Sequence, residues 1–494
     1  MKKFIVSLIF VIPSFATINQ SMQWDVRQTG SDSNSGGFDP FVTSPGTDYS
    51  QQNSPQITYT DIVVGAITST YTSTLNVVSS TLPGNTLKIT GGTGCTTGVF
   101  EILSNSTITA TVDRSLGTAA SVCTGVLGGS LLTLGTAFTR VTVAHQNVWV
   151  CGSCGTGTFT ITSELDFPQD DTTVWGYTSI HNDCTPVSCN KPTIQSSTAG
   201  IKMFNAESFY ITLNYLNILA NIGFSQYAIL VSNGDGVVIL NSKMTGNGAS
   251  TVAAVDGYNA NYSIFIINTE ISNWNWGIFV SNGSSSQQYS ISIIDSYVHG
   301  NTIAGITDAG NNISASFQWI SNNTVWDRNG YGMYMQANSA EPNSGIIAIS
   351  SIFSNSTNDG INNQSAFHQN GNTSFYSNSI FYANGGYGVN TPFSGGCPLG
   401  GSTFGQVSFN NGVGSNTSGN YNCVTSPGDV ALTADPFVSS STGNFALNST
   451  SGGGAALKAV GFPGITPMGT GHLDIGTLQS LGGSTGSAPH AYVQ

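Results

Sequence analysis

Charged side chains are scarce in this sequence. Its 494 residues include 11 Lys and Arg and 24 Asp and Glu, so that 7% of the chain is charged, where an ordinary globular protein has about 25%. The scarcity argues against long amphipathic helices, whose wet faces need Glu and Lys. A charged disordered chain is also excluded, because 39% of the residues are apolar and can form a core. The formal net charge of -13 predicts no nucleic-acid partner and no anionic membrane partner.

Long apolar runs are few as well. The chain begins with Lys2 and Lys3, an apolar run over residues 4–12 and the small-x-small sequence that ends at Ala16. This order is typical of an export signal cleaved after Ala16. The run is far shorter than the roughly 20 residues of a transmembrane helix, and no later run is long enough. We therefore expect a secreted or cell-surface protein with no transmembrane span.

Eight cysteines fit an oxidising compartment. Their local grouping suggests four disulfides, although sequence alone does not fix the pairing: Cys95 with Cys123, Cys151 with Cys154, Cys184 with Cys189, and Cys397 with Cys423. The alternative is a zinc site formed by the four thiolates of the second and third groups. Oxidising conditions favour the disulfides.

A repeat of 27 residues organises the middle of the chain. Residues with small polar side chains recur in one column at spacings of 27, 27, 27, 27, 28 and 27: Asn214, Asn241, Asn268, Asp295, Asn322, Ser350 and Ser377. Three residues after the last six of these lies an apolar residue: Met244, Ile271, Val298, Val325, Phe353 and Ile380. Further on, a glycine followed by an apolar residue recurs, as at Gly277-Ile278 and Gly305-Ile306.

Units this short cannot bury an apolar face alone, whereas stacked copies share a continuous core. The repeat therefore predicts an all-β chain of parallel coils, with a hydrogen-bonded ladder of polar side chains at one corner. A propeller is disfavoured, because its blades need about 40 to 50 residues.

The stretch Phe317 to Met333 (FQWISNNTVWDRNGYGM) resembles the repeats of secreted right-handed parallel β-helix proteins, the pectin-lyase-like superfamily. Trp24 to Gly37 resembles the first segment of such proteins, and residues 435–437, 443–447 and 473–479 resemble their closing region. The resemblance implies a right-handed parallel β-helix of about seven or more coils of 27 residues. Proteins with this fold include lyases, hydrolases, epimerases, adhesins and phage tail proteins, so the fold leaves the substrate open.

Five parts are expected along the chain. They are a signal peptide over 1–16, an N-terminal cap segment over 17–56, an inserted small β module over 57–135, the β-helix with its closing region over 136–481, and a flexible tail over 482–494. Strand-like segments between Gly-rich turns indicate the module, among them Ile62–Val64, Leu75–Val78 and Thr86–Ile89. The module either covers the open end of the β-helix, which we favour, or serves attachment.

Candidate catalytic residues gather around Arg328. The predicted columns place His299 beside Trp326, with Asp327 next in the chain and Asp308 on the preceding coil. A lyase of the superfamily it resembles would need a base for the C5 proton and commonly Ca²⁺ to neutralise a uronate. Arg328 or His299 is then the candidate base, and Asp308 and Asp327 are the candidate Ca²⁺ ligands.

Each of these residues also has a structural explanation. Asp327 and Arg328 are expected to pair with each other if they lie on the surface, and Asp295 belongs to the corner column. A hydrolase would instead need two carboxylates, which Asp295, Asp308 and Asp327 offer. Lys243 and Glu270 lie 27 residues apart, which predicts an ion pair between adjacent coils.

Aromatic residues indicate a second candidate site. The candidate sugar-binding residues are Trp274, Trp276, Phe279, Trp326, Tyr331 and Tyr334. Phe279 and Tyr334 share a predicted column with Asp256, Thr307, Asn362 and Asn390. Aromatic faces stack on the C–H faces of sugars while polar neighbours bind the hydroxyls. The alternative is that individual rings fill the core.

We predict an exported β-helix protein that engages a polysaccharide or surface glycan along a lateral face. It is either an enzyme, a lyase rather than a hydrolase, or a non-catalytic adhesin, structural rod or phage-type fibre component that can form a homotrimer. The sequence lacks the GHG motif with paired aspartates, the DPHD motif and the WxDH motif of enzymes of the superfamily it resembles, which weakens the enzyme hypothesis. The export signal weakens the phage hypothesis.

Overall fold

The computed structural model describes residues 19–460, apart from 77–80, 187, 233–235, 249–250, 259–261, 282–287, 310–315, 337–344, 365–373, 393–405 and 459. The predicted signal peptide, the predicted tail and Cys397 lie outside the described residues. The chain forms two compact units, Met1–Asn147 and Val148–Gln494.

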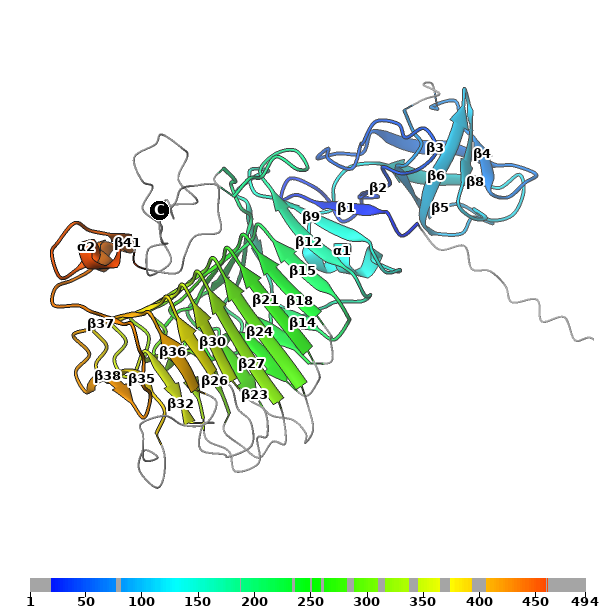
Figure 1. Cartoon of the computed structure of the whole chain (residues 1–494). Helices are drawn as coiled ribbons and strands as arrows, with labels where there is room; N and C mark the ends of the chain where they lie inside the picture. Colours follow the sequence, from blue (N-terminus) through cyan, green and yellow to red (C-terminus); the bar gives the residue numbers. More distant parts are fainter. Residues whose placement is uncertain are drawn as a thin grey trace, which may run out of the picture. The chain divides into compact units, whose positions relative to one another are not determined.

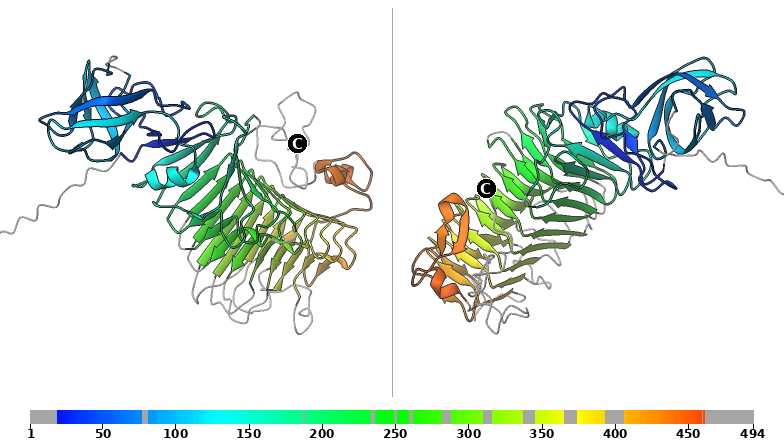
Figure 2. Two further views of the ribbon diagram at one scale, coloured as in Figure 1. Left: turned by 180° about the vertical axis from the view of Figure 1, so that it is seen from behind. Right: turned by 90° about the horizontal axis from the view of Figure 1, so that it is seen from above.

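The first unit contains a small closed β-barrel (Figure 2). The order around the barrel is β3 (Ile57–Val64), β4 (Thr70–Thr72), β7 (Thr109–Val112), β6 (Gly98–Ser106), β5 (Thr86–Gly91) and β8 (Val122–Leu127). Tyr59, Leu87 and Phe100 fill its interior. The unit also holds β1 (Gln23–Val26), β2 (Gly37–Phe38) and α1 (Leu134–Arg140). The predicted small β module is confirmed.

One predicted strand of this module is wrong. The segment that begins at Leu75 is not a strand, because Asp61 accepts hydrogen bonds from Ser73 Oγ (2.6 Å) and from the backbone N–H of Thr74 (2.8 Å) and so holds a turn there. The strand of this region is β4 instead, and residues 77 and 78 lie outside the described residues.

The second unit is a right-handed parallel β-helix whose coils run through three sheets (Figure 1). The first sheet contains β9 (Asn147–Cys151), β12 (Thr173–Tyr177), β15 (Ile211–Asn214), β18 (Gly236–Leu240), β21 (Tyr262–Ile267), β24 (Gln288–Ile294), β27 (Ser316–Asn322), β30 (Gly345–Ile349), β33 (Ser374–Ser377) and β36 (Gln406–Phe409). The second sheet contains β10 (Thr158–Thr160), β13 (Thr193–Ser196), β16 (Asn217–Ala220), β19 (Lys243–Thr245), β22 (Glu270–Ser272), β25 (Tyr297–His299), β28 (Val325–Asp327), β31 (Ile352–Ser354), β34 (Ile380–Tyr382), β37 (Gly412–Gly414) and β39 (Val430–Ala431).

The third sheet contains β11 (Leu165–Asp166), β14 (Phe204–Ala206), β17 (Ile229–Val231), β20 (Ala253–Tyr258), β23 (Trp276–Ser281), β26 (Ala304–Asp308), β29 (Tyr331–Met335), β32 (Ile361–Asn363), β35 (Tyr387–Asn390) and β38 (Gly419–Asn422). A C-terminal segment follows, with β40 (Phe437–Ser439), a 3-10 turn (Ser440–Thr442), β41 (Asn444–Leu447) and α2 (Gly454–Leu457). Phe437, Phe445 and Leu457 of this segment pack on Val325 and Ile352 of the second sheet.

The corner between the first and second sheets carries the predicted ladder. Asn268 donates to Asn241 (2.7 Å) and Asn378 to Ser350 (3.0 Å), each residue having a left-handed backbone. The predicted column is one residue early at three places, because Asn214, Asn322 and Ser377 are the last residues of their strands. The left-handed residues that follow them are Tyr215, Asn323 and Asn378. At Asn322-Asn323 both neighbours suit such a corner, so the sequence does not choose between them.

The same shift changes the predicted apolar column. Val298 pairs with Trp326, which pairs with Phe353, which pairs with Phe381. Trp326 and Phe381 therefore point into the β-helix, whereas Val325 and Ile380 lie on the outer side of the second sheet, where the C-terminal segment buries them.

Buried hydroxyl groups form a second ladder, one residue past the corner. Its members are Ser242, Thr269, Ser296, Thr324, Ser351 and Ser379, all buried. Thr269 Oγ1 accepts from the backbone N–H of Ser242 (3.3 Å), and Ser296 Oγ accepts from that of Thr269 (3.2 Å). Neutral side chains thus satisfy the backbone inside the corner, where a charge would be costly. The ladder explains part of the scarcity of charge.

The recurring glycines form a column at the start of the third sheet. A Cβ on Gly332 would lie 2.3 Å from the carbonyl oxygen of Gly360, and one on Gly305 would lie 2.6 Å from that of Gly332. Adjacent coils therefore lie too close together here for any residue other than glycine.

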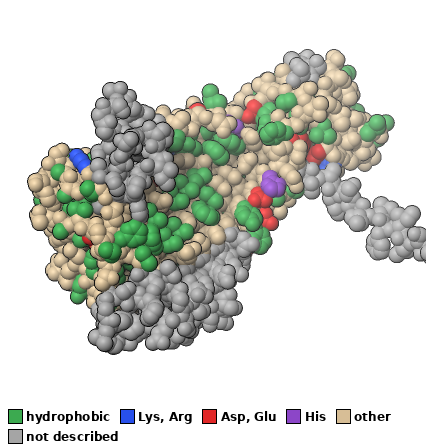
Figure 3. All heavy atoms as spheres, in the orientation of Figure 1, with side chains coloured by type: hydrophobic (Ala, Val, Ile, Leu, Met, Phe, Trp, Pro, Cys, Tyr) green, Lys and Arg blue, Asp and Glu red, His purple; other side chains and the backbone are tan. Residues whose placement is uncertain are grey.

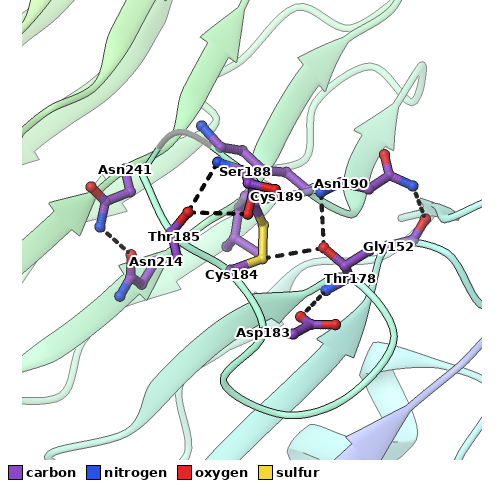
Figure 4. The surroundings of a disulfide bond; sticks show 12 residues. Gly152, Thr178, Asp183, Cys184, Thr185, Ser188, Cys189, Asn190, Asn214 and Asn241 are labelled. Atoms are coloured by element: carbon purple, nitrogen blue, oxygen red, sulfur yellow. Dashed lines mark hydrogen bonds between the residues drawn. A yellow bond between two sulfur atoms is a disulfide. The ribbon is translucent and has the colours of Figure 1, made fainter. Parts of the chain in front are cut away.

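Three of the predicted disulfides are present: Cys95–Cys123, Cys151–Cys154 and Cys184–Cys189. Figure 4 shows the last of these beside Thr178 and Asn190. Cys423 is also disulfide-bonded, while its predicted partner Cys397 lies outside the described residues. The zinc alternative is wrong, because its four thiolates are taken up by two disulfides. The described part of the chain has no helix that is long and apolar enough to cross a membrane.

Candidate functional site

The four predicted catalytic residues do not lie together. His299, Asp327 and Arg328 lie at the second sheet, in and directly after β25 and β28, whereas Asp308 ends β26 in the third sheet. Side chains alternate along a strand, so Asp308 points to the inner side, as Ile306 does. The predicted centre is therefore wrong as a single cluster, and Asp308 and Asp327 do not face a common Ca²⁺ ion.

Asp308 is a buried carboxyl group that is only partly satisfied. Asp308 is 2% exposed, and its Oδ1 accepts a hydrogen bond from the backbone N–H of Gln336 (2.8 Å). Oδ2 is buried without a partner. Burial raises the pKa of Asp308 to about 7. Within the described residues no group of three or more His, Cys, Asp or Glu could hold a metal ion.

Asp327 is fully buried and positions its neighbours. Its Oδ2 accepts from Arg328 Nε (2.6 Å), and its Oδ1 accepts from Ser354 Oγ (3.1 Å) and Asn355 Nδ2 (2.9 Å). Both oxygens are thus occupied by donors from this chain. The expected pairing of Asp327 with Arg328 is present, with the carboxylate beneath the surface rather than on it.

Arg328 lies at the corner after the second sheet with a left-handed backbone (φ 50), which is uncommon for a long side chain. Its guanidinium Nη2 donates to the hydroxyl of Tyr297 (3.1 Å), and its side chain is 47% exposed. Burial and the charge of Asp327 raise the pKa of Tyr297 to about 12. An exposed cation is therefore held beside a phenol that keeps its proton at neutral pH.

His299 belongs to the same outer face. It pairs with Asp327 and not with Trp326, as a consequence of the corrected register. His299 Nε2 lies 3.1 Å from Glu270 Oε1, which also lies 3.0 Å from Lys243 Nζ, so the predicted Lys243–Glu270 ion pair is confirmed. Burial tends to raise the pKa of Glu270, but hydrogen bonds from His299 and Lys243 outweigh it and lower the pKa. The His299 ring stacks on that of Tyr297, with centroids 3.9 Å apart.

Two of the predicted sugar-binding residues lie in the core. Trp274 and Trp326 are both 0% exposed. Trp326 Nε1 donates to Ser321 Oγ (2.9 Å), and its ring stacks on Phe353. Neither ring reaches a surface ligand, so the prediction is wrong for these two residues.

The other four aromatic residues are partly exposed and form two stacked pairs in the third sheet. Trp276 stacks on Phe279 with ring centroids 4.5 Å apart, and Tyr331 stacks on Tyr334 at 4.6 Å. The coil between the two pairs has Ala304 and Thr307 at the matching positions. Two aromatic platforms thus lie two coils apart, roughly 10 Å at the usual strand spacing.

The predicted column through these pairs is confirmed. It runs through adjacent strands as Asp256, Phe279, Thr307, Tyr334, Asn362 and Asn390. Asn362 Nδ2 (2.6 Å) and Asn390 Nδ2 (2.9 Å) both donate to Asp359, whose role the sequence did not reveal.

Asp256 adds an ionisable group to this face. Burial raises its pKa to about 6, although Ser281 donates to it through both its backbone N–H (3.2 Å) and its Oγ (2.8 Å). Its place in the Phe279 column was visible in the sequence, but its burial was not. Glu270 was also missed as a neighbour of His299.

The sequence matches no family model and no curated protein. Among solved structures, pectate lyase Pel9A is similar with a TM-score of 0.41 and 15% identity, covering 71% of this chain and 91% of that chain. The A-module of the mannuronan C-5 epimerase AlgE6 of Azotobacter vinelandii has a TM-score of 0.35 and 11% identity, covering 60% of this chain and 74% of that chain. The ORF18 protein of Geobacillus virus E2 has a TM-score of 0.32 and 13% identity, covering 58% and 52%. Structural similarities this weak say nothing about the activity of this chain.

Proposed function

We propose that this protein is exported and binds polysaccharide along the outer face of the third sheet. The observation that carries the proposal is the pair of aromatic platforms, Trp276 with Phe279 and Tyr331 with Tyr334, on one face of stacked strands. Aromatic rings bind the C–H faces of sugars, and two such pairs on one face can bind two sugar units of the same chain. A polymer with a repeating unit fits a protein face that itself repeats along the solenoid. The disulfides fit export.

Replacing Trp276 or Tyr334 by Ala should weaken glycan binding by about tenfold or more, because each loses a stacking surface. Binding to a panel of neutral and uronic polysaccharides is measured by affinity electrophoresis and calorimetry. Phe209→Ala is the control, since Phe209 is an exposed ring outside the third sheet. Equal losses in all three variants, or no binding to any glycan by the parent protein, would contradict the proposal.

A second candidate function is cleavage of a uronate polysaccharide at the outer face of the second sheet. Glu270 accepts the Nε2 proton of His299, which leaves Nδ1 as a base for the C5 proton. As the C5–H bond breaks, the C4–O bond breaks with its electron pair, the double bond forms between C4 and C5, and Tyr297 protonates the leaving oxygen. Arg328 pairs with the uronate carboxylate. Hydrolysis is less well supported, because Asp295 lies in the corner ladder, Asp308 faces inward and Asp327 is occupied.

For this candidate we expect His299→Gln and Arg328→Ala to lower the rate of unsaturated-product formation by about 100-fold or more. The rate is followed by ultraviolet absorbance, with and without added Ca²⁺. Lys202→Ala serves as the control, since Lys202 forms its ion pair with Glu164, away from this cluster. If no polysaccharide yields product, the protein is a binding rod or adhesin and the cleavage candidate is wrong.

A further inference from the structure

The strands of the first sheet from β9 to β36 contain no charged residue. None of the strands β18, β21, β24, β27, β30, β33 and β36 includes Asp, Glu, Lys or Arg. The second and third sheets do carry charges, as at Glu270, Asp327 and Asp256. The absence is therefore a property of one sheet and not only of the composition.

The outer side of this sheet is largely apolar along two of its three columns. Ile239, Ile266 and Ile293 face the core with no exposure, so the residues that alternate with them face outward. One outward column is polar and contains Ser263, Ser290 and Gln318, and the other two are mostly apolar. The apolar members of the two columns, all at least partly exposed, are Val238, Phe265, Ile320, Ile347, Phe375 and Val407 in one, and Leu240, Ile267, Ile294, Ile349 and Phe409 in the other. Phe265 and Val407 are 38% and 43% exposed. Figure 3 shows hydrophobic side chains gathered over the strands that Figure 1 labels β18 to β27.

Long exposed columns of apolar side chains are unusual on a folded protein, because contiguous apolar surface in water is normally small. The C-terminal segment covers part of the second sheet, where Phe437 and Phe445 pack on Val325. Within the described part of the chain, no helix or strand packs on the apolar columns of the first sheet in the same way. Contiguous apolar surface of this size marks an interaction site.

We propose that this face pairs with the same face of a second copy of the chain. The first reason is chemical: eight of the eleven apolar side chains in the two columns are aliphatic, such as Ile320 and Ile347, and these offer a sugar neither a stacking surface nor hydrogen bonds. This face therefore suits a glycan less well than the stacked aromatic pairs of the third sheet do. The second is periodicity. The columns repeat once per coil, about 4.8 Å, and a second copy presents side chains with the same repeat, so that two such sheets interdigitate about 10 Å apart.

Charge and size support the same partner. The chain has a formal net charge of -13, so two copies repel each other except where uncharged surfaces meet. From Val238 to Val407 the face measures roughly 30 Å by 16 Å, so a pair buries roughly 1,000 Å². This area lies at the lower limit for a specific interface, which is about 1,000 Å². A two-fold pairing uses the same patch on both copies, so the patch must be complementary to itself. A repetitive uncharged face meets this requirement.

The test is the mass of the purified full chain in sedimentation equilibrium across a concentration series. We expect a dimer, and we expect Phe265→Asp and Ile320→Asp each to raise its dissociation constant by at least about 100-fold, because pairing buries a carboxylate in each copy without a partner. Both side chains face outward, so the variants should keep the circular dichroism spectrum and Tm of the parent.

Thr245→Asp is the matched control, since Thr245 is an outward strand residue of the second sheet. It should leave the dimer unchanged. A parent protein that stays monomeric at all concentrations overturns the proposal, as does a dimer that survives both substitutions. Trimer formation, or binding to phosphatidylcholine vesicles by a monomeric parent, overturns the two-fold pairing. Glycan binding is measured separately, so its failure leaves this result unaffected.

Discussion

Gly332→Ala is expected to lower the free energy of unfolding of the β-helix by about 4 kcal/mol or more. The added Cβ would lie 2.3 Å from the carbonyl oxygen of Gly360 and 3.0 Å from Cδ1 of Phe353. A backbone oxygen in a hydrogen-bonded sheet cannot move away without separating two coils, so the collision is relieved only by breaking strand pairing. Thermal and urea unfolding of the parent and the variant measure the loss.

Gly135→Ala provides the control for this substitution. Gly135 lies in α1 of the first unit, and a Cβ there would meet nothing within 4 Å. Alanine is the better helix former by roughly 1 kcal/mol, so this variant should be as stable as the parent or more so. A Gly332→Ala protein with the Tm of the parent would show that the glycine column has no steric role.

Trp326→Ala is expected to destabilise the β-helix by about 3–5 kcal/mol, the usual cost of removing a large buried ring. The ring is fully buried, stacks on Phe353 and donates a hydrogen bond to Ser321. Under conditions where the variant is folded, its glycan affinity should equal that of the parent, because the ring does not reach the surface. Urea unfolding and binding assays on the same samples measure both quantities.

Trp276→Ala should show the opposite pattern. Trp276 is partly exposed and stacks on Phe279 at the outer face of the third sheet, so its loss should weaken glycan binding with a smaller effect on stability. If Trp326→Ala weakened binding while leaving stability intact, the assignment of Trp326 to the core would be wrong.

The fold was predictable because the period is almost constant. The Gly-apolar pairs, such as Gly277-Ile278 and Gly305-Ile306, fixed the register of the third sheet, and the Phe279–Tyr334 column followed correctly. At the first corner the sequence offers Asn322 and Asn323 in succession, and either can adopt the left-handed backbone. In the structure Asn323 has the left-handed backbone. Because the corner lies at Asn323 and not at Asn322, Trp326 points into the core and His299 pairs with Asp327.

The candidate sites were predictable only where the register was correct. A column says which residues are neighbours on successive coils, but not whether they face the core or the solvent. Asp308 and Asp327 were close in sequence and on successive coils, yet one follows the inward alternation of Ile306 and the other faces the outer side. The roles of Asp256 and Glu270 depend on burial and on hydrogen bonds from neighbouring coils, which no spacing in the sequence expresses.

In five consecutive coils, the second sheet separates two left-handed residues by a constant number of positions. Asn268 and Asn273, Asp295 and Gly300, and Asn323 and Arg328 are each five residues apart, as are Ser350 and Asn355, and Asn378 and Ala383. Differences in coil length therefore fall almost entirely outside this sheet. The second sheet thus forms an edge of constant length in each of these coils. The connections outside this sheet differ in length from coil to coil. New loops can be acquired one coil at a time without disturbing the alignment of the side chains on this edge.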